Sequence, residues 1–466
     1  MNKFTCLGVT LLLVFAMGLP LFNGVSATTS VGNTIDGSTT WTVAGSPYAL
    51  TEDLYIYSGE TLTIQPGVVV NLRGYKIQIY GELRAQGTNN NRIHFSGDGF
   101  SNSQIIFKPA SAQSCAIDYG VFYSVPITIE GGSPRLANGY FTGTASNSAV
   151  ITVNSGTVSI IDNVISTQNT QDGIQINAGY VTITGNTLSG ARAQQGCGIF
   201  NTGSTAPITL NKITNFYTGI YTNTPCMIER NTITNNVNDG IVVEGTTDVT
   251  IRHNAITYNK CGISGDANIQ NNTISHNTYG LWSQTSRSTI QYNNIVDSSV
   301  EGIHLTEASD VLATNNWWGT TVESNIRQRI SDYDQNLRSN LGVVTFTPFL
   351  TTPAYAPALP PAVVVPTPPP APFATVSPSP GSNLSPSPDS MDAYPTYAPY
   401  SPYPSPTSGD PTIIRPVQPT GEPGIGGFGI TDIITAVVIV VAVSVAITII
   451  LIINRIHSNT QQTHWP

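Results

Sequence analysis

An asparagine followed two residues later by an aliphatic residue recurs along the middle of the chain, and this repeat constrains the fold more than any other feature. The repeats are separated by 18 to 25 residues. Between them, Gly-Ile and similar pairs form a second apolar position. The repeated asparagines are Asn163, Asn186, Asn211, Asn231, Asn254, Asn272, Asn293 and Asn316.

Apolar residues alternate with polar ones just before each asparagine. In one repeat, Val249 and Ile251 precede Asn254, and Ile256 follows it. Alternation of this kind is typical of a half-buried strand, whereas a helix would space its apolar residues three and four apart. A repeat of this length with short strands and no helical pattern predicts one coil of a β-solenoid, in which like residues stack at ~4.8 Å.

The repeated polar residues have architectural roles in such a coil. We expect each asparagine to occupy a fixed turn, to tolerate left-handed backbone geometry, and to hydrogen-bond the asparagines above and below it. Glycine is expected at the other bend, where φ is positive or two backbones approach closely.

The repeats NTITNN, NAITYN and NTISHN, with the recurring DGI and CGI, resemble the parallel β-helix repeats of pectate-lyase-like and NosD-like proteins. SGETLTIQPGVVVNL at 58–72 resembles the opening coils of such surface proteins, and TNNWWGT at 314–320 resembles their closing coil. The resemblance implies an all-β, right-handed, three-sheet parallel β-helix over residues 28–350, with about 13 coils. Residues 100–157 match the repeat only loosely.

Both ends of the chain carry apolar segments. Residues 1–27 have a lysine, an apolar core and a small-x-small ending, which predicts a secretory signal peptide. Residues 430–454 include 433–453, an uncharged run long enough to span a ~30 Å hydrocarbon core, and 455–466 would form a short cytoplasmic tail. The pattern predicts a single-pass membrane protein with its repeat domain outside the cell.

A proline-rich segment separates the repeats from the apolar run. Residues 351–429 hold more than half of the chain's 32 prolines. Proline lacks the N–H that helices and sheets need, so we expect a disordered, extended stalk of ~3 Å per residue that holds the domain off the membrane.

Charge limits the classes of partner. The formal net charge is −9, and only 10% of residues are charged. Binding to nucleic acid needs a basic surface, so the composition argues against such a partner. Polysaccharides, neighbouring envelope proteins and calcium remain compatible with it.

One predicted outward row suggests binding. The residue after each turn isoleucine or leucine faces outward, and in four repeats this residue is aromatic: Phe200, Tyr221, Trp282 and His304. Flat aromatic side chains beside Asn and Thr suit a sugar. Packing of the rings beneath a long turn is the alternative.

An acidic turn gives a second hypothesis. Glu244, Asp248 and Asp266 are predicted to approach one another on adjacent coils, and three carboxylates suit calcium. A solvated turn neutralised by Arg287 is the alternative. The Gly-His-Gly with paired aspartates of galacturonan hydrolases in the resembled family is missing.

The remaining polar motifs are few. Cys115, Cys197, Cys226 and Cys261 are expected to be buried free thiols, because Cys197 and Cys261 are too far apart for a disulfide. Glu229 and Arg252 are predicted to form a surface ion pair. Asn271 and Asn383 begin N-x-[ST] sequons and are candidate glycosylation sites.

Taken together, these features predict a membrane-anchored surface module that recognises carbohydrate or envelope proteins. A polysaccharide lyase or glycoside hydrolase using the acidic turn is the alternative, and a passive spacer in the envelope is a third possibility.

Overall fold

The computed structural model describes residues 28–143, 148–168, 171–245, 248–283, 288–336 and 341–354. The predicted signal peptide, nearly all of the stalk, the membrane segment and the tail lie outside these residues. Within the described ranges, no helix is both long and apolar enough to cross a membrane.

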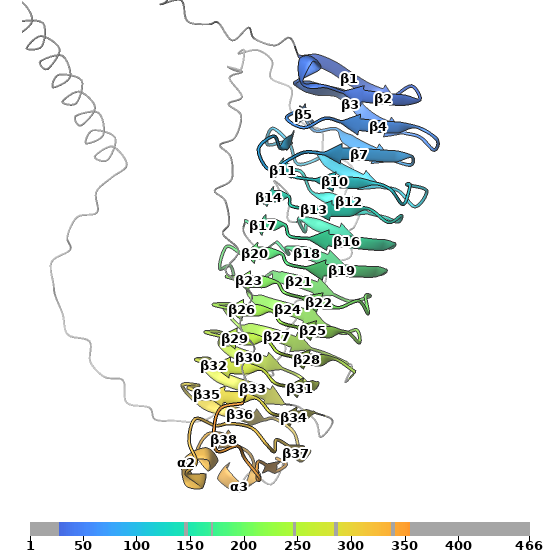
Figure 1. Ribbon diagram of the computed structural model, residues 1–466. Helices are drawn as coiled ribbons and strands as arrows, with labels where there is room; N and C mark the ends of the chain where they lie inside the picture. The colour runs from blue at the N-terminus through green and yellow to red at the C-terminus, as the bar shows by residue number, and fades with distance from the viewer. Residues whose placement is uncertain are drawn as a thin grey trace, which may run out of the picture. The chain divides into compact units, whose positions relative to one another are not determined.

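Short parallel strands stack along the chain in a column that runs from β1 to β38 (Figure 1). Each full coil contributes one strand to each of three sheets, as the repeat predicts. The first sheet has 14 strands. They are β2 (Ser38–Trp41), β4 (Thr61–Ile64), β7 (Glu82–Gln86), β10 (Ala116–Asp118), β13 (Arg135–Ala137), β16 (Thr157–Ile161), β19 (Tyr180–Thr184), β22 (Ile208–Thr209), β25 (Met227–Glu229), β28 (Thr250–Arg252), β31 (Asn268–Gln270), β34 (Thr289–Gln291), β37 (Val311–Leu312) and β39 (Val344–Thr345).

The second sheet holds the strand that follows each repeated asparagine. Its strands are β5 (Val69–Asn71), β8 (Ile93–Ser96), β11 (Gly120–Tyr123), β14 (Tyr140–Thr142), β17 (Val164–Ser166), β20 (Thr187–Ser189), β23 (Lys212–Thr214), β26 (Thr232–Thr234), β29 (Ala255–Thr257), β32 (Thr273–Ser275) and β35 (Asn294–Val296).

The third sheet holds the strand that carries the turn isoleucine, and the long strand β3 joins it to the second sheet by pairing with both β5 and β6. Its strands are β1 (Thr29–Thr34), β3 (Tyr48–Ile56), β6 (Lys76–Ile79), β9 (Gln104–Phe107), β12 (Ile127–Ile129), β15 (Ile151–Val153), β18 (Ile174–Ile176), β21 (Cys197–Asn201), β24 (Thr218–Thr222), β27 (Asp239–Val243), β30 (Cys261–Ser264), β33 (Tyr279–Ser283), β36 (Glu301–Leu305) and β38 (Ile330–Ser331).

Aliphatic side chains fill the space between the three sheets. Ile228, Ile233 and Ile241, one from each sheet in a single coil, are fully buried, and the same positions are buried in the neighbouring coils. A short helical turn, η1 (Val43–Gly45), lies near the start, and α2 (Glu323–Arg327) and α3 (Tyr333–Asn336) follow the last repeat. Trp318 takes the place of the inward isoleucine there and is fully buried, which closes the end of the second sheet's inward row.

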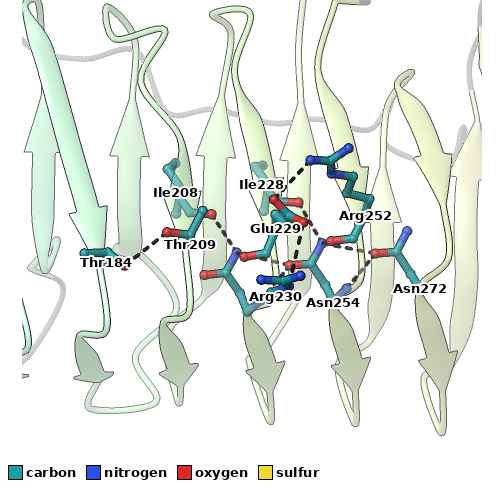
Figure 2. Close-up of polar contacts among 10 residues, drawn as sticks. Thr184, Ile208, Thr209, Ile228, Glu229, Arg230, Arg252, Asn254 and Asn272 are labelled. Carbon is teal, nitrogen blue, oxygen red and sulfur yellow. Dashed lines mark hydrogen bonds and ion pairs between the residues drawn. The ribbon is translucent and has the colours of Figure 1, made fainter. Parts of the chain in front are cut away.

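The repeated asparagines form a buried ladder between the first and second sheets, as predicted. Asn231 Oδ1 accepts hydrogen bonds from the backbone N–H of Asn211 at 2.8 Å and from its Nδ2 at 3.1 Å. Asn231 Nδ2 donates to the carbonyl of Ile208 and to Asn254 Oδ1. Figure 2 shows the next pair of the ladder, Asn254 and Asn272, facing each other across adjacent coils.

The predicted backbone geometry of the ladder is wrong in one respect. The left-handed residue is the one before each ladder asparagine, such as Leu210, Arg230 and His253, with φ of 60°, 56° and 57°. The chain turns at this preceding residue, so the asparagine keeps ordinary φ and its amide points inward. The side chains of Leu210 and Arg230 at this position are exposed to solvent.

A second, shorter asparagine ladder lies between the second and third sheets, and the sequence reasoning missed it. Asn236 donates to Asn259 Oδ1 through its backbone N–H and its Nδ2, both at 3.0 Å, and Asn259 donates in the same way to Asn277. Beside this ladder, a Cβ on Gly240 would lie 2.6 Å from the carbonyl of Gly262 and 3.0 Å from Asn259 Nδ2. Gly240 and Gly262 are therefore needed because adjacent coils approach closely here, and neither has a positive φ.

Candidate functional site

The third sheet carries the predicted aromatic row on its outer surface. Strand pairing aligns Phe200 with Tyr221, and Trp282 with His304, on adjacent coils. The rings of Phe200 and Tyr221 are stacked, with centroids 4.7 Å apart and planes 11° from parallel. Trp282 and His304 meet edge to face at 4.6 Å, and Tyr279 packs against both rings.

The row is not one continuous aromatic surface. Val242 and Ser264 occupy the two positions between Tyr221 and Trp282, and both are buried, at 3% exposed. The four aromatic residues themselves are partly exposed. The sequence register is therefore confirmed, but the structure divides the row into a Phe200–Tyr221 pair and a Trp282–His304 pair.

Polar groups sit beside each aromatic pair. The hydroxyl of Tyr221 donates to the carboxylate of Glu244. His304 Nδ1 contacts Glu301 Oε2 at 2.6 Å, and both side chains are about one quarter exposed. A carboxylate that holds one imidazole nitrogen orients the ring and leaves the other nitrogen for a second partner.

The three carboxylates of the predicted acidic turn do not come together. Asp266 is buried and accepts hydrogen bonds from the hydroxyls of Ser283 at 3.2 Å and Ser288 at 2.9 Å. Glu244 and Asp248 are exposed. No three His, Cys, Asp or Glu side chains among the described residues are placed to share a metal ion. Arg287 lies outside the described residues, and calcium binding stays a prediction.

The buried Asp239 and the half-buried Asp172 lie in a separate row of the third sheet, two residues before the inward isoleucine. Asp172 Oδ1 accepts from the backbone N–H of Cys197 at 2.6 Å, and the Asp239 carboxylate accepts from the amide of Asn238. Burial raises the pKa of Asp172 to about 6 and the pKa of Asp239 to about 7. The sequence reasoning noted both residues but had no signal for their burial, since aspartate is usually solvated.

The four cysteines among the described residues are free, as expected. Cys115, Cys226 and Cys261 are buried, and Cys197 is half-buried. Burial raises the pKa of all four thiols. A thiol that resists ionisation is a poor nucleophile and a poor metal ligand, so these side chains act as small core residues.

The other predicted surface residues have ordinary surroundings. Arg252 Nη2 lies 3.2 Å from Glu229 Oε2, which confirms that ion pair (Figure 2). The sequon residue Asn271 occupies one of the left-handed turn positions and is partly exposed. Asn383 lies outside the described residues.

An open hollow of about 530 Å³ lies at the C-terminal end of the described chain. It is lined by residues of α2, α3, β39 and the segment after β39, among them Arg327 and Phe346. None of the predicted site residues lines it, so it is not part of the aromatic surface.

Comparison with known proteins supports the fold. Residues 127–268 match the family model for a right handed beta helix region. This region is a right-handed β-helix. Its coils continue beyond the match in both directions, because the strand pairing runs without a break from β1 to β38.

One solved structure similar to the β-helix is a mutant of the periplasmic alginate epimerase AlgG. It shares 13% sequence identity, covers 62% of this chain and 78% of its own, and aligns with a TM-score of 0.35. No curated protein sequence matches the chain.

Proposed function

We propose that the β-helix is the carbohydrate-binding module of a membrane-anchored cell-surface protein. The supporting observation is the stacked Phe200–Tyr221 pair on the outer face of the third sheet, with the carboxylate of Glu244 hydrogen-bonded to the Tyr221 hydroxyl. Aromatic rings present a flat apolar face to a sugar ring, and polar groups beside them bond its hydroxyls. The signal peptide, the stalk and the membrane segment are part of the same proposal and would place this face outside the cell.

Retention of polysaccharides tests the proposal. The full-length chain is run in native gels that contain one polysaccharide each, with and without calcium. The combined Tyr221→Ala and Trp282→Ala variant is expected to lose the retention seen for the wild type. Tyr180→Ala is a matched control, because Tyr180 is 51% exposed on the first sheet, away from the aromatic row.

An enzymatic function is the second candidate, and the Glu301–His304 contact beside Trp282 is the observation that favours it. A carboxylate-oriented histidine next to a sugar-stacking ring is an arrangement suited to general acid–base chemistry. Chain cleavage is followed in the same panel by the release of reducing ends and by ultraviolet absorbance. Cleavage that disappears in His304→Gln would establish a polysaccharide lyase or hydrolase. Cleavage that disappears with chelator, or in Asp266→Asn, would instead implicate the acidic turn.

Retention without cleavage supports a binding module. If no polysaccharide is retained or cleaved, the carbohydrate proposal fails, and contact with envelope proteins or a passive structural role remains.

A further inference from the structure

The outer surface of the third sheet continues far beyond the predicted aromatic residues. Strand pairing links Gln175 to Phe200 on one side and to Thr152 on the other, and the register continues strand by strand to Tyr55. A second row lies two residues further along the chain, immediately after the end of each strand. We call these two rows, from β3 to β24, the outer track. Its members are Tyr55, Gln78, Ile106, Thr128, Thr152, Gln175, Phe200 and Tyr221 in the first row, and Tyr57, Tyr80, Lys108, Glu130, Asn154, Asn177, Thr202 and Asn223 in the second.

Aromatic residues also gather at the N-terminal end of the outer track. Tyr55 and Tyr57 are stacked with centroids 5.8 Å apart, and the Tyr57 and Tyr80 rings are 6.0 Å apart and tilted by 30°. Tyr57 is 46% exposed. We call these three tyrosines the Tyr57 patch. The Asn-x-Ile repeat does not predict this patch, because the patch precedes the first repeat.

Polar side chains lie between the Tyr57 patch and the Phe200–Tyr221 pair, and those nearest the pair are linked to one another. Asn177 Nδ2 donates to Asn154 Oδ1 at 2.8 Å on the neighbouring coil, and Gln175 Nε2 donates to Asn177 Oδ1 at 3.1 Å. Amide and hydroxyl groups both donate and accept hydrogen bonds, as sugar hydroxyls do. The track therefore has an aromatic platform at each end and, apart from the buried Ile106, polar or charged side chains between them.

The charges on this face argue against an acidic ligand. Lys108 is the cationic residue of the outer track, and its Nζ forms an ion pair with Glu130 Oε2 at 3.0 Å. Glu244 lies beside the C-terminal end of the track. An anionic chain would meet carboxylates and a lysine that is already paired.

We propose that the outer track binds one neutral, unbranched polysaccharide chain lengthwise, with the Tyr57 patch as a second aromatic platform. Six strand spacings separate Tyr55 from Phe200, which is ~29 Å at the usual spacing of paired strands. A polymer reaches both platforms at once, whereas a short oligosaccharide reaches only one. This inference rests on the proposed carbohydrate-binding function and adds the second platform, the direction of the chain and its neutrality.

Dependence on chain length tests the inference. Dissociation constants of the full-length chain are measured for linear mannan, xylan and β-glucan, each as a polymer and as an oligosaccharide shorter than the span between the platforms. Alginate and pectate are the acidic comparisons. The variants are Tyr57→Ala with Tyr80→Ala, Phe200→Ala with Tyr221→Ala, and all four together, with Tyr180→Ala as the control.

Two linked platforms give avidity, so loss of either one is expected to weaken binding of the neutral polymer on the order of 10²-fold. The same loss should change oligosaccharide affinity only a few-fold, because an oligosaccharide can use the platform that remains. Thermal unfolding of each variant checks that the β-helix is intact. Tyr57 is half exposed, so its loss should leave the fold unchanged.

Three results would overturn the inference. If the Tyr57→Ala and Tyr80→Ala variant binds the polymer as the wild type does, while the Phe200→Ala and Tyr221→Ala variant does not, the lengthwise track is wrong and the proposed function stands. Tighter binding of alginate or pectate than of the neutral polymers would contradict the neutral ligand. If no polymer binds the wild type at all, the inference and the proposed function fail together.

Discussion

The two coils formed by β10–β12 and β13–β15 and the coils after residue 157 build the same turn in two different ways. In the later coils, an asparagine amide fills the corner between the first and second sheets, and an isoleucine follows two residues later. In the earlier coils, Gly120 and Gly139 stand at the asparagine position, and Phe122 and Phe141 stand at the isoleucine position. The backbone is the same, because Tyr119 and Asn138 before these glycines have φ of 55° and 54°, as their counterparts in the ladder do.

The difference shows that either an amide or an aromatic ring can fill this corner. A Cβ on Gly120 would lie 2.6 Å from the ring of Phe122, and a Cβ on Gly139 would lie 2.7 Å from the ring of Phe141. The rings of Phe95, Phe122 and Phe141 stack at 5.0 and 4.3 Å. The two kinds of coil meet where the backbone N–H of Gly139 donates to Asn163 Oδ1 at 2.8 Å.

Removal of one amide from the middle of the ladder is expected to have the largest effect. Asn231→Ala removes the five hydrogen bonds of this side chain, which involve the backbone N–H and Nδ2 of Asn211, the carbonyls of Ile208 and Glu229, and Asn254 Oδ1. Asn254 Oδ1 keeps its bond from the backbone N–H of residue 231, but the Asn211 N–H loses its acceptor. Each hydrogen bond contributes ~1 kcal/mol net, so the free energy of unfolding should fall by about 5 kcal/mol. Denaturant unfolding measures it, with the exposed Asn223→Ala as control. A loss below ~1 kcal/mol would show that the ladder is not a stabilising element.

The two regions also differ in the residue that stands two positions before each inward isoleucine of the third sheet. The earlier coils place buried Val125 and Ala149 there, whereas a later coil places Asp239, of which one carboxylate oxygen has no hydrogen-bond partner among the described residues. Burial raises the Asp239 pKa from 3.8 to about 7. The folded state therefore holds a proton that the unfolded state releases.

Stability should fall as the pH rises from 4 to 7, because the unfolded chain releases this proton first. Each unit of pKa difference is worth ~1.4 kcal/mol, so the loss has an upper limit of ~4 kcal/mol. Asp239→Asn removes this contribution and should stabilise the protein at pH 8 relative to the wild type, with little change at pH 4. Denaturant unfolding of both proteins at the two pH values measures the difference. An unchanged pH dependence in the variant would show that Asp239 is not the group responsible.

Conversion of one corner type into the other tests whether amide and ring are alternatives. Gly139→Asn should clash with the Phe141 ring, and Phe141→Ile should leave a void, so each is expected to destabilise the protein by about 2 kcal/mol. The combined variant extends the Asn-x-Ile pattern by one coil, and it should recover ~1–2 kcal/mol of the summed loss. Unfolding of the four proteins in a double-mutant cycle measures the coupling. Simple additivity would mean that the two residues do not share the corner.

This contrast also explains how much of the structure could be predicted. The Asn-x-Ile repeat predicted the coils, the strand register and the ladder, because the amide contacts recur with the sequence period. The earlier coils do not match the repeat in sequence, because Gly-x-Phe shares no residue type with Asn-x-Ile, although both form the same turn. The left-handed position was misplaced by one residue because asparagine is the usual occupant of such geometry, whereas Leu210 and Tyr292 occupy it here.

The sequence could predict only those features of the candidate site that depend on strand register, which sets the residues that lie side by side on adjacent coils. Stacking of Phe200 on Tyr221 follows from equal positions in adjacent coils. The burial of Val242 and Ser264 does not follow from register. Both residues belong to the outward row, and the repeat pattern is the same for buried and exposed residues of that row. The Tyr57 patch was missed because its coils lack the repeat, although Tyr55, Tyr57 and Tyr80 follow the same alternation along their strands.

The smallest expected effect compares ion pairs at equal places in the two regions. Glu229 lies two residues before a ladder asparagine, and Asp118 lies two residues before Gly120. Glu229 pairs with Arg252 directly across the strands, whereas Asp118 pairs with Arg135 on a diagonal. Both arginines are close to half exposed, so solvent screens each pair. Glu229→Gln and Asp118→Asn should each cost less than ~1 kcal/mol, and 0.5 M salt should reduce both effects. Unfolding at low and high salt measures them. A salt-independent loss in Glu229→Gln alone would mean that its hydrogen bonds, rather than its charge, hold the neighbouring coils of the ladder together.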